Sequence, residues 1–162
     1  MNAPDADALS ISASYAARLA DAGFPVESSA LDACGVEMLD VRADALLAVA
    51  TFLRDVCQFD LLLSVSGVDR SDYRESLAHL YSLDTHDTLC LRTRADDADR
   101  VDSLTPVWPA ADWHERESYD LMGIVYEGHP DLRRILMPAD WIGHPLRKDY
   151  VENDPRLVWN HR

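Results

Sequence analysis

The chain has 162 residues, a length that suits one domain with a short extension at either end. Hydrophobic residues make up 48% and charged residues 27% of the sequence, which is typical of a globular protein and excludes a disordered one. The net charge of −14 repels nucleic acid and anionic membrane surfaces, so we expect no direct binding to either.

The first part of the chain is expected to form a helix followed by two strands. In residues 10–22 apolar side chains recur every four residues, and Gly23 can end the helix. Residues 26–31 and 36–41 have the composition of strands around a turn at 32–35. These elements place a small β-ribbon after the first helix.

A second helix and three strands are expected next. Asp44 can cap a helix that runs to about Cys57 with a wide apolar stripe. Residues 59–66 are nearly all apolar, which predicts a strand covered on both faces, and 76–83 and 88–93 alternate as further strands.

The remaining sequence divides the chain into three parts. An acidic loop at 95–99 is expected to lead into a short helix ending at Leu104, and Asp112 can cap another helix that Gly123 ends. We therefore expect an α+β fold: a mostly antiparallel or mixed sheet with helices on one face, plus an extended C-terminal arm. The predicted parts are an α+β body at residues 1–112, a short signature helix at 113–122 and the arm at 123–162.

The segment from Gly123 to Tyr150 contains three of the six glycines and three of the eight prolines in the chain. Its apolar residues follow neither the period of a strand nor that of a helix, so it is too broken to build a core of its own. A long segment of this kind is normally functional or bound, and we expect it to lie on a neighbouring protein.

The stretch from Trp113 to Asp120 contains the densest group of polar residues. One hypothesis is a metal or acid–base site built from Glu115, Glu117 and Asp120 with His114, His129 or His144. The chain has no HExxH motif, and the histidines lack the spacing of metal ligands. The other hypothesis is a charge network that holds the helix to the arm, with Arg116 beside Asp120 at i, i+4.

Two further segments have features of a cofactor site. Residues 128–134 and 145–149 place paired basic side chains after a Gly-containing turn, which can bind phosphate, but neither segment is a P-loop or a dinucleotide fingerprint. Arginines that bind carboxylates or carbonyls of a partner are the alternative. Cys34, Cys57 and Cys90 form no CxxC pair, so no cysteine-held zinc or iron–sulfur site is expected.

Three ordered segments resemble the signature of a known family: 113–124 (WHERESYDLMGI), 126–136 (YEGHPDLRRIL) and 143–150 (GHPLRKDY). The chain is similar here to the thirty-kilodalton subunit of the proton-pumping NADH:quinone oxidoreductase, respiratory complex I. The resemblance covers roughly residues 40–150, and Phe59–Leu62 and Ser66–Asp69 belong to it. Met122 departs from it, since an aromatic residue is common there.

The resemblance implies a non-catalytic structural subunit in the peripheral, hydrophilic arm of the complex. FMN, iron–sulfur clusters and quinone are then expected in partner subunits, with no cofactor, metal or catalytic residue in this chain. The partners would be the other peripheral-arm subunits, above all the large quinone-site subunit and the iron–sulfur subunits. The predicted interface residues are Trp113, Glu115, Arg116, Glu117, Asp120, Gly128, His129, Pro130, Arg133, Arg134, Pro145, Leu146, Arg147, Lys148 and Asp149.

The expected location is the cytoplasmic side of the plasma membrane, reached only through the complex. No apolar run approaches the about 18 residues needed to cross a bilayer, and residues 1–7 lack the features of a signal peptide. Two alternatives stay open: the equivalent subunit of a membrane-bound energy-converting hydrogenase, and a small independent metalloenzyme that uses the Glu115, Glu117, Asp120 and histidine cluster.

Overall fold

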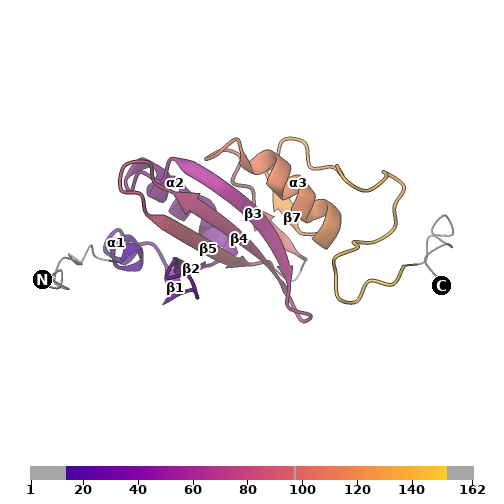
Figure 1. Ribbon diagram of the computed structural model, residues 1–162, viewed down its shortest axis with the longest axis horizontal. Helices are drawn as coiled ribbons and strands as arrows, with labels where there is room; N and C mark the ends of the chain where they lie inside the picture. Colours follow the sequence, from indigo (N-terminus) through magenta and orange to yellow (C-terminus); the bar gives the residue numbers. More distant parts are fainter. Residues whose placement is uncertain (1–13, 97, 153–162) are drawn as a thin grey trace, which may run out of the picture.

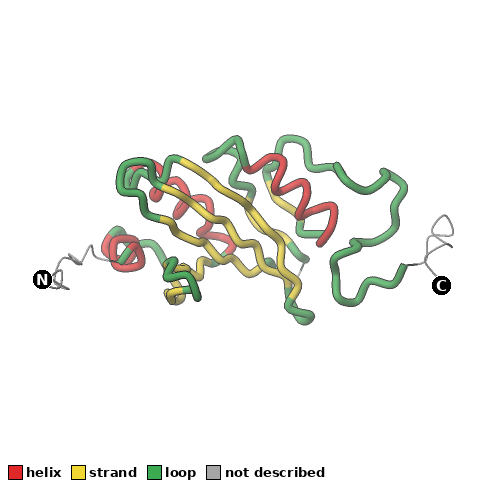
Figure 2. Tube along the Cα trace, viewed as in Figure 1, coloured by secondary structure: helices red, strands yellow, loops and turns green. Residues whose placement is uncertain are grey.

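The computed structural model describes residues 14–96 and 98–152. Within this part of the chain, three α-helices and two sheets follow one another along the sequence (Figures 1 and 2). The elements are α1 (Tyr15–Asp21), β1 (Val26–Leu31), β2 (Glu37–Val41), the 3₁₀ turn η1 (Ala43–Ala45), α2 (Leu46–Asp55), β3 (Leu61–Asp69), β4 (Arg74–Tyr81), β5 (Thr88–Arg94), β6 (Arg100–Asp102), α3 (Ala111–Met122) and β7 (Val125–Glu127).

The main sheet has five strands in the order β1-β2-β5-β4-β3. β2 and β5 are parallel, with Leu39 opposite Leu91, and the other three pairs are antiparallel. β6 and β7, which precede and follow α3 in the sequence, form a separate parallel pair, with Val101 opposite Tyr126. The mixed sheet and the helices confirm the expected α+β class.

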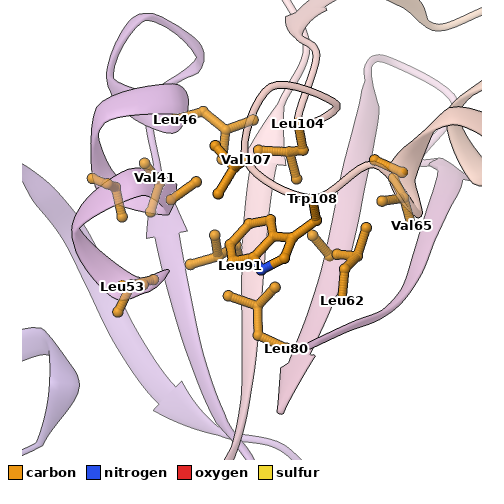
Figure 3. Close-up of a cluster of buried hydrophobic side chains, with 14 of the residues drawn as sticks. Val41, Leu46, Leu53, Leu62, Val65, Leu80, Leu91, Leu104, Val107 and Trp108 are labelled. Carbon is orange, nitrogen blue, oxygen red and sulfur yellow. The ribbon is translucent and has the colours of Figure 1, made fainter. Parts of the chain in front are cut away.

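The core lies between the sheet and α2. Leu46, Val49, Ala50 and Leu53 of α2 are buried there against inward-facing residues of the strands. Trp108 completes this layer (Figure 3), and its indole Nε1 donates to the carbonyl of Phe59 at 3.0 Å, so its one polar atom is satisfied. Each large apolar side chain buried in this way stabilises the fold by roughly 1.5–3 kcal/mol.

β3 is covered on one face only, which corrects the prediction from its apolar sequence. Leu62 is buried, but Leu61 and Leu63 are 41% and 49% exposed. The pairing register with β4 shifts between Leu62 and Ser64, where a β-bulge is accommodated. An edge position and an uncovered face therefore account for a strand that reads as central.

Three expectations about element boundaries also need correction. Asp44 does not cap α2: it pairs with Arg42, and the cap residue Ala45 makes no side-chain bond. Residues 100–102 form β6 instead of a helix, because they pair with β7. Asp112 lies in the first turn of α3, after the cap residue Ala110. The predicted first helix begins in residues that the structure does not describe.

No helix in the described residues is long and apolar enough to span a membrane.

Candidate functional site

Side-chain hydrogen bonds join the helix α3 to the arm that follows it. α3 ends at Gly123, which has a left-handed φ of 76° and whose N–H donates to the carbonyl of Tyr119. The buried side of α3 is largely polar, with Glu115, Arg116 and Asp120 among its buried residues. Such a helix is stable only if these groups find partners inside the protein.

Glu115 attaches α3 to the segment that follows β6. Its side chain has no exposed surface and accepts from the Ser103 hydroxyl at 2.7 Å and from the Leu104 N–H at 2.6 Å. Burial raises the pKa of Glu115 to about 7, although these two hydrogen bonds favour the ionised form. Glu115 therefore holds the polypeptide before α3 in place and faces no solvent.

Asp120 attaches α3 to the arm. Its Oδ2 accepts the backbone N–H groups of Ile135, Leu136 and Met137 at 2.7–3.0 Å, and its Oδ1 lies 2.6 Å from Nη1 of Arg134. Burial pushes the pKa of this carboxyl upward, but the donors of Met137, Leu136, Arg134 and Ile135 together bring it below its usual value. Three successive amides on one oxygen form a turn around the carboxylate and fix the course of the arm.

Arg116 and His129 make a second connection between α3 and the arm. The guanidinium of Arg116 donates to the carbonyl of Arg133 at 3.3 Å and lies 4.8 Å from the ring centroid of Trp113. The Nδ1 of His129 accepts the N–H of Asp131, which leaves Nε2 to donate to the carbonyl of Asp112 at 3.2 Å. A histidine held at both nitrogens by the backbone is a structural residue here.

The far end of the arm returns to the body. Nε of Arg147 donates to the Met122 carbonyl at 2.7 Å, and its Nη2 lies 3.2 Å from Asp99. The N–H of Lys148 donates to Asp69 at 2.8 Å. The segment expected to be ordered only by a neighbour is therefore bonded to α3, to the 95–99 loop and to β3.

Close contact between α3 and β3 depends on a small residue. A Cβ added at Gly67 would lie 2.5 Å from Oγ of Ser118. That hydroxyl accepts from Tyr126 at 2.9 Å, and Tyr126 in turn lies 3.1 Å from Oγ of Ser76. A buried row of hydroxyl groups thus joins α3, β7 and β4.

The structure separates the predicted interface residues by exposure. Glu115, Arg116 and Asp120 are buried, and the side chain of His129 has no exposed surface, so their contacts are with this chain. Arg134, Pro145 and Arg147 are partly buried. The exposed members are Trp113, Glu117, Gly128, Pro130, Arg133, Leu146, Lys148 and Asp149.

The predicted charge network between helix and arm is present, but its pairs differ from the expected ones. Asp120 pairs with Arg134 of the arm, and Arg116 lies 3.7 Å from Asp112. Helical spacing alone favoured an ion pair between Arg116 and Asp120, because that spacing relates only residues of the same helix and gives no information about partners in the arm. Glu117 is exposed and makes none of these contacts.

The carboxylates proposed for a metal or acid–base site do not converge. Glu115 and Asp120 accept from separate sets of backbone donors, and His144 donates from Nδ1 to the Asp120 carbonyl at 3.0 Å. Burial, aided by Arg147 and Arg134, lowers the pKa of His144. Among the described residues no group of three or more His, Cys, Asp or Glu side chains is arranged to hold a metal ion.

The predicted phosphate segments are occupied in another way. Arg134 and Arg147 donate to carbonyls and carboxylates of this chain, and Arg133 is paired with Asp131 at the surface. Asp69 and Asp99, which receive the end of the arm, were missed. The 95–99 loop reads as a solvated acidic turn, and only the folded chain brings Arg147 to it.

Apolar side chains are exposed on α3 and along the arm. They are Trp113, Leu136, Ile142, Leu146 and Val151, with exposed fractions from 56% to 89%. Exposed apolar groups held on an ordered scaffold and surrounded by polar residues are typical of a protein–protein interface. Figure 1 shows α3 beside the sheet and the arm beyond it, at one end of the molecule.

Comparison with known proteins identifies the family. The sequence pattern of the respiratory-chain NADH dehydrogenase 30 kDa subunit matches residues 39–156, which include the three signature segments and most of the sheet. The chain belongs to this 30 kDa subunit family.

Several curated NADH-quinone oxidoreductase subunits are similar to the chain. One from Geobacter sulfurreducens is 41% identical over 126 residues, covering 75% of this chain and 78% of the relative. Its counterpart in an Azoarcus species is 44% identical over 141 residues, covering 79% and 70%. For a Roseiflexus species the identity is 46% over 115 residues, with 67% and 66% covered.

A solved structure shares the fold. It comes from the membrane-bound sulfane sulfur reductase, an archaeal respiratory membrane complex, and aligns with a TM-score of 0.66 at 23% identity. The alignment covers 90% of this chain and 87% of the other. The fold of the 30 kDa subunit family is thus found in a second kind of respiratory complex.

Proposed function

We propose that this chain is a non-catalytic structural subunit of the peripheral arm of NADH:quinone oxidoreductase, the complex that couples electron transfer from NADH to quinone with proton translocation. The observation that carries the proposal is the ordered arm, which Asp120 attaches to α3 while Leu136, Ile142 and Leu146 stay exposed. Membership of the 30 kDa subunit family supplies the kind of assembly.

The division of labour follows from the same proposal. FMN, the iron–sulfur clusters and quinone belong to partner subunits, and the isolated chain has no activity. The arm contacts the large quinone-site subunit and the iron–sulfur subunits. The chain sits on the cytoplasmic side of the membrane, which it meets only through the complex.

The equivalent subunit of an energy-converting hydrogenase is the less favoured alternative, because the curated relatives from Geobacter, Azoarcus and Roseiflexus are all named as subunits of the quinone enzyme. An independent metalloenzyme is not supported, because Glu115 and Asp120 are used to hold the fold.

Affinity purification of the tagged chain from membranes of its source cells tests the proposal. We expect the purified assembly to oxidise NADH with quinone as acceptor, and the chain purified alone to be inactive and free of flavin and iron–sulfur absorption. Turnover by the chain alone, or its absence from the active assembly, would contradict the proposal.

A further inference from the structure

The helix α2 remains apolar beyond the residues that are buried against the core. Leu46, Val49, Ala50 and Leu53 are buried, and the partly buried Leu47 and Phe52, which also pack against the core, extend the apolar surface toward the exposed Ala48 on the outer side. A surface helix normally presents charged or polar residues outward. The outer side of α2 therefore combines polar residues such as Thr51 and Asp55 with more apolar surface than a solvent-facing side usually carries.

This outer side forms an open groove of about 630 Å³ between α2 and the chain around Phe24. Phe24 and Phe52 form one wall, with their ring centroids 5.1 Å apart. The α2 groove is lined by Phe24, Asp44, Leu47, Ala48, Thr51, Phe52, Asp55, Val56 and Asp102.

One carboxylate of the groove lacks a counter-charge. Asp44 pairs with Arg42 and Asp55 pairs with Arg54. The side-chain carboxylate of Asp102 makes no hydrogen bond or ion pair with any described residue. Burial, Glu127 and Asp44 all raise the pKa of Asp102, in that order of effect, so the site would gain from a cation.

We propose that the α2 groove receives a segment of a neighbouring subunit that places a lysine or arginine against Asp102 and apolar side chains against Phe52 and Leu47. The inference rests on the proposed function, since it adds a second contact between this chain and the same assembly. A charge that is unpaired at the edge of an apolar surface favours a cationic partner and disfavours an acidic one.

The chain's own ends fit this groove less well. Residues 1–13 contain Asp5 and Asp7 and no lysine or arginine. Their side-chain charges have the same sign as that of Asp102, so the two would repel each other. Residues 153–162 contain Arg156 and Arg162, but they follow the arm, whose described part lies at the opposite end of the molecule from α2 in Figure 1. A subunit on the α2 side is the occupant that satisfies both charge and position.

Photo-crosslinking in the assembled complex tests the proposal. The full chain carries p-benzoylphenylalanine in place of Ala48, which is exposed within the groove, or in place of the exposed Asp84 as a control. After illumination of native membranes, mass spectrometry locates the crosslinked peptide. We expect position 48, and not position 84, to crosslink one segment of another subunit that contains a lysine or arginine among apolar residues.

Charge reversal supplies the second arm. Asp102→Lys should lower the amount of assembled complex on native gels about tenfold, while Asp84→Lys should change it by less than about twofold. The introduced ammonium group would lie opposite Glu127 in the β6–β7 pair, so the variant is expected to fold. Replacing the crosslinked cation of the partner by glutamate should restore assembly with Asp102→Lys.

The remaining outcomes overturn the proposal. A crosslink from position 48 to residues 1–13, to residues 153–162 or to a second copy of this chain assigns the groove to this protein itself. An assembled, active complex without a crosslink from position 48, or with normal assembly of Asp102→Lys, removes the second contact but leaves the proposed function standing. If the chain is absent from the complex altogether, both fail.

Discussion

The buried carboxylate of Asp120 lies 2.6 Å from the guanidinium of Arg134, fourteen residues further along the chain. The same carboxylate accepts three consecutive backbone N–H groups of the arm. This one side chain therefore joins the end of α3 to residues 134–137 of the arm by four donors, and its removal should loosen the arm at these residues.

Asp120→Asn should lower the free energy of unfolding by about 3 kcal/mol, because an amide keeps the shape but loses the charge that binds Arg134 and the three amides. Urea unfolding measures the change, and hydrogen exchange should show faster exchange at 135–137 than in β4. Asp131→Asn, at an exposed ion pair, is the control and should leave the free energy of unfolding close to that of the wild type. Equal stability of the two variants would contradict the assigned role.

Because of Asp120, we also expect the folded chain to lose stability in acid. Its pKa is below the usual 3.8 in the folded chain, so its contribution to stability is complete above that value and is lost as the pH falls through the lower folded value. Asp120→Asn lacks this titration. The difference in unfolding free energy between the wild type and the variant should therefore shrink below pH 4 in chemical denaturation. A difference that stays constant with pH would argue against an ionised Asp120.

Glu115 should show the opposite dependence. Its pKa is raised from 4.5 to about 7, so the unfolded chain ionises first as the pH rises, and the folded state loses roughly 2–3 kcal/mol of relative stability between pH 4.5 and pH 7. Glu115→Gln removes that loss. The free energy of unfolding of the variant, minus that of the wild type, should rise over this range and level off above it. Parallel curves would show that the carboxyl titrates normally.

Gly67→Ala should destabilise the chain by about 1–3 kcal/mol, because the added Cβ would lie 2.5 Å from Oγ of Ser118 and 3.1 Å from Cδ1 of Ile124. Ser118 cannot turn away without losing its bond to Tyr126. Thermal unfolding measures the effect, with Ser66→Ala on the exposed face of the same strand as the matched control. If both variants unfold at the wild-type temperature, α3 and β3 are less closely packed than these distances indicate.

Two arginines of the arm should separate docking from folding. The side chain of Arg133 is 67% exposed, so Arg133→Ala should leave stability unchanged within about 0.5 kcal/mol and still reduce the amount of complex on native gels. Arg147→Ala removes bonds to Met122 and Asp99 and should lower both stability and assembly. Normal amounts of complex with lost turnover for Arg133→Ala would instead assign it to the reaction.

The sheet and the helix α3 could be predicted from local patterns. The alternation in β4 and β5 and the position of Gly123 are local signals, and the structure agrees with them. The strand β6 could not be foreseen, because three residues form it only through pairing with Val125–Glu127 beyond α3. Its sequence carries no strand pattern of sufficient length.

In the site, too, local sequence patterns indicated some features, whereas contacts between distant residues could not be predicted. The residue types of the signature helix indicated a charge network with the arm, and that network exists. The partners of Asp120 could not be read from spacing, because they lie in irregular backbone whose course the carboxylate itself sets. Asp69 and Asp99 were missed because each receives an arm residue from more than forty positions away.

The arm takes its shape from three carboxylates on three different elements: Asp69 on β3, Asp99 before β6 and Asp120 on α3. No two of them are neighbours in the sequence, so they meet only after the sheet, the β6–β7 pair and the helix have formed. A partner that binds the arm in this conformation therefore binds only copies whose body has folded. Incorporation into an assembly through this surface would act as quality control, because a misfolded copy presents no arm of the right form.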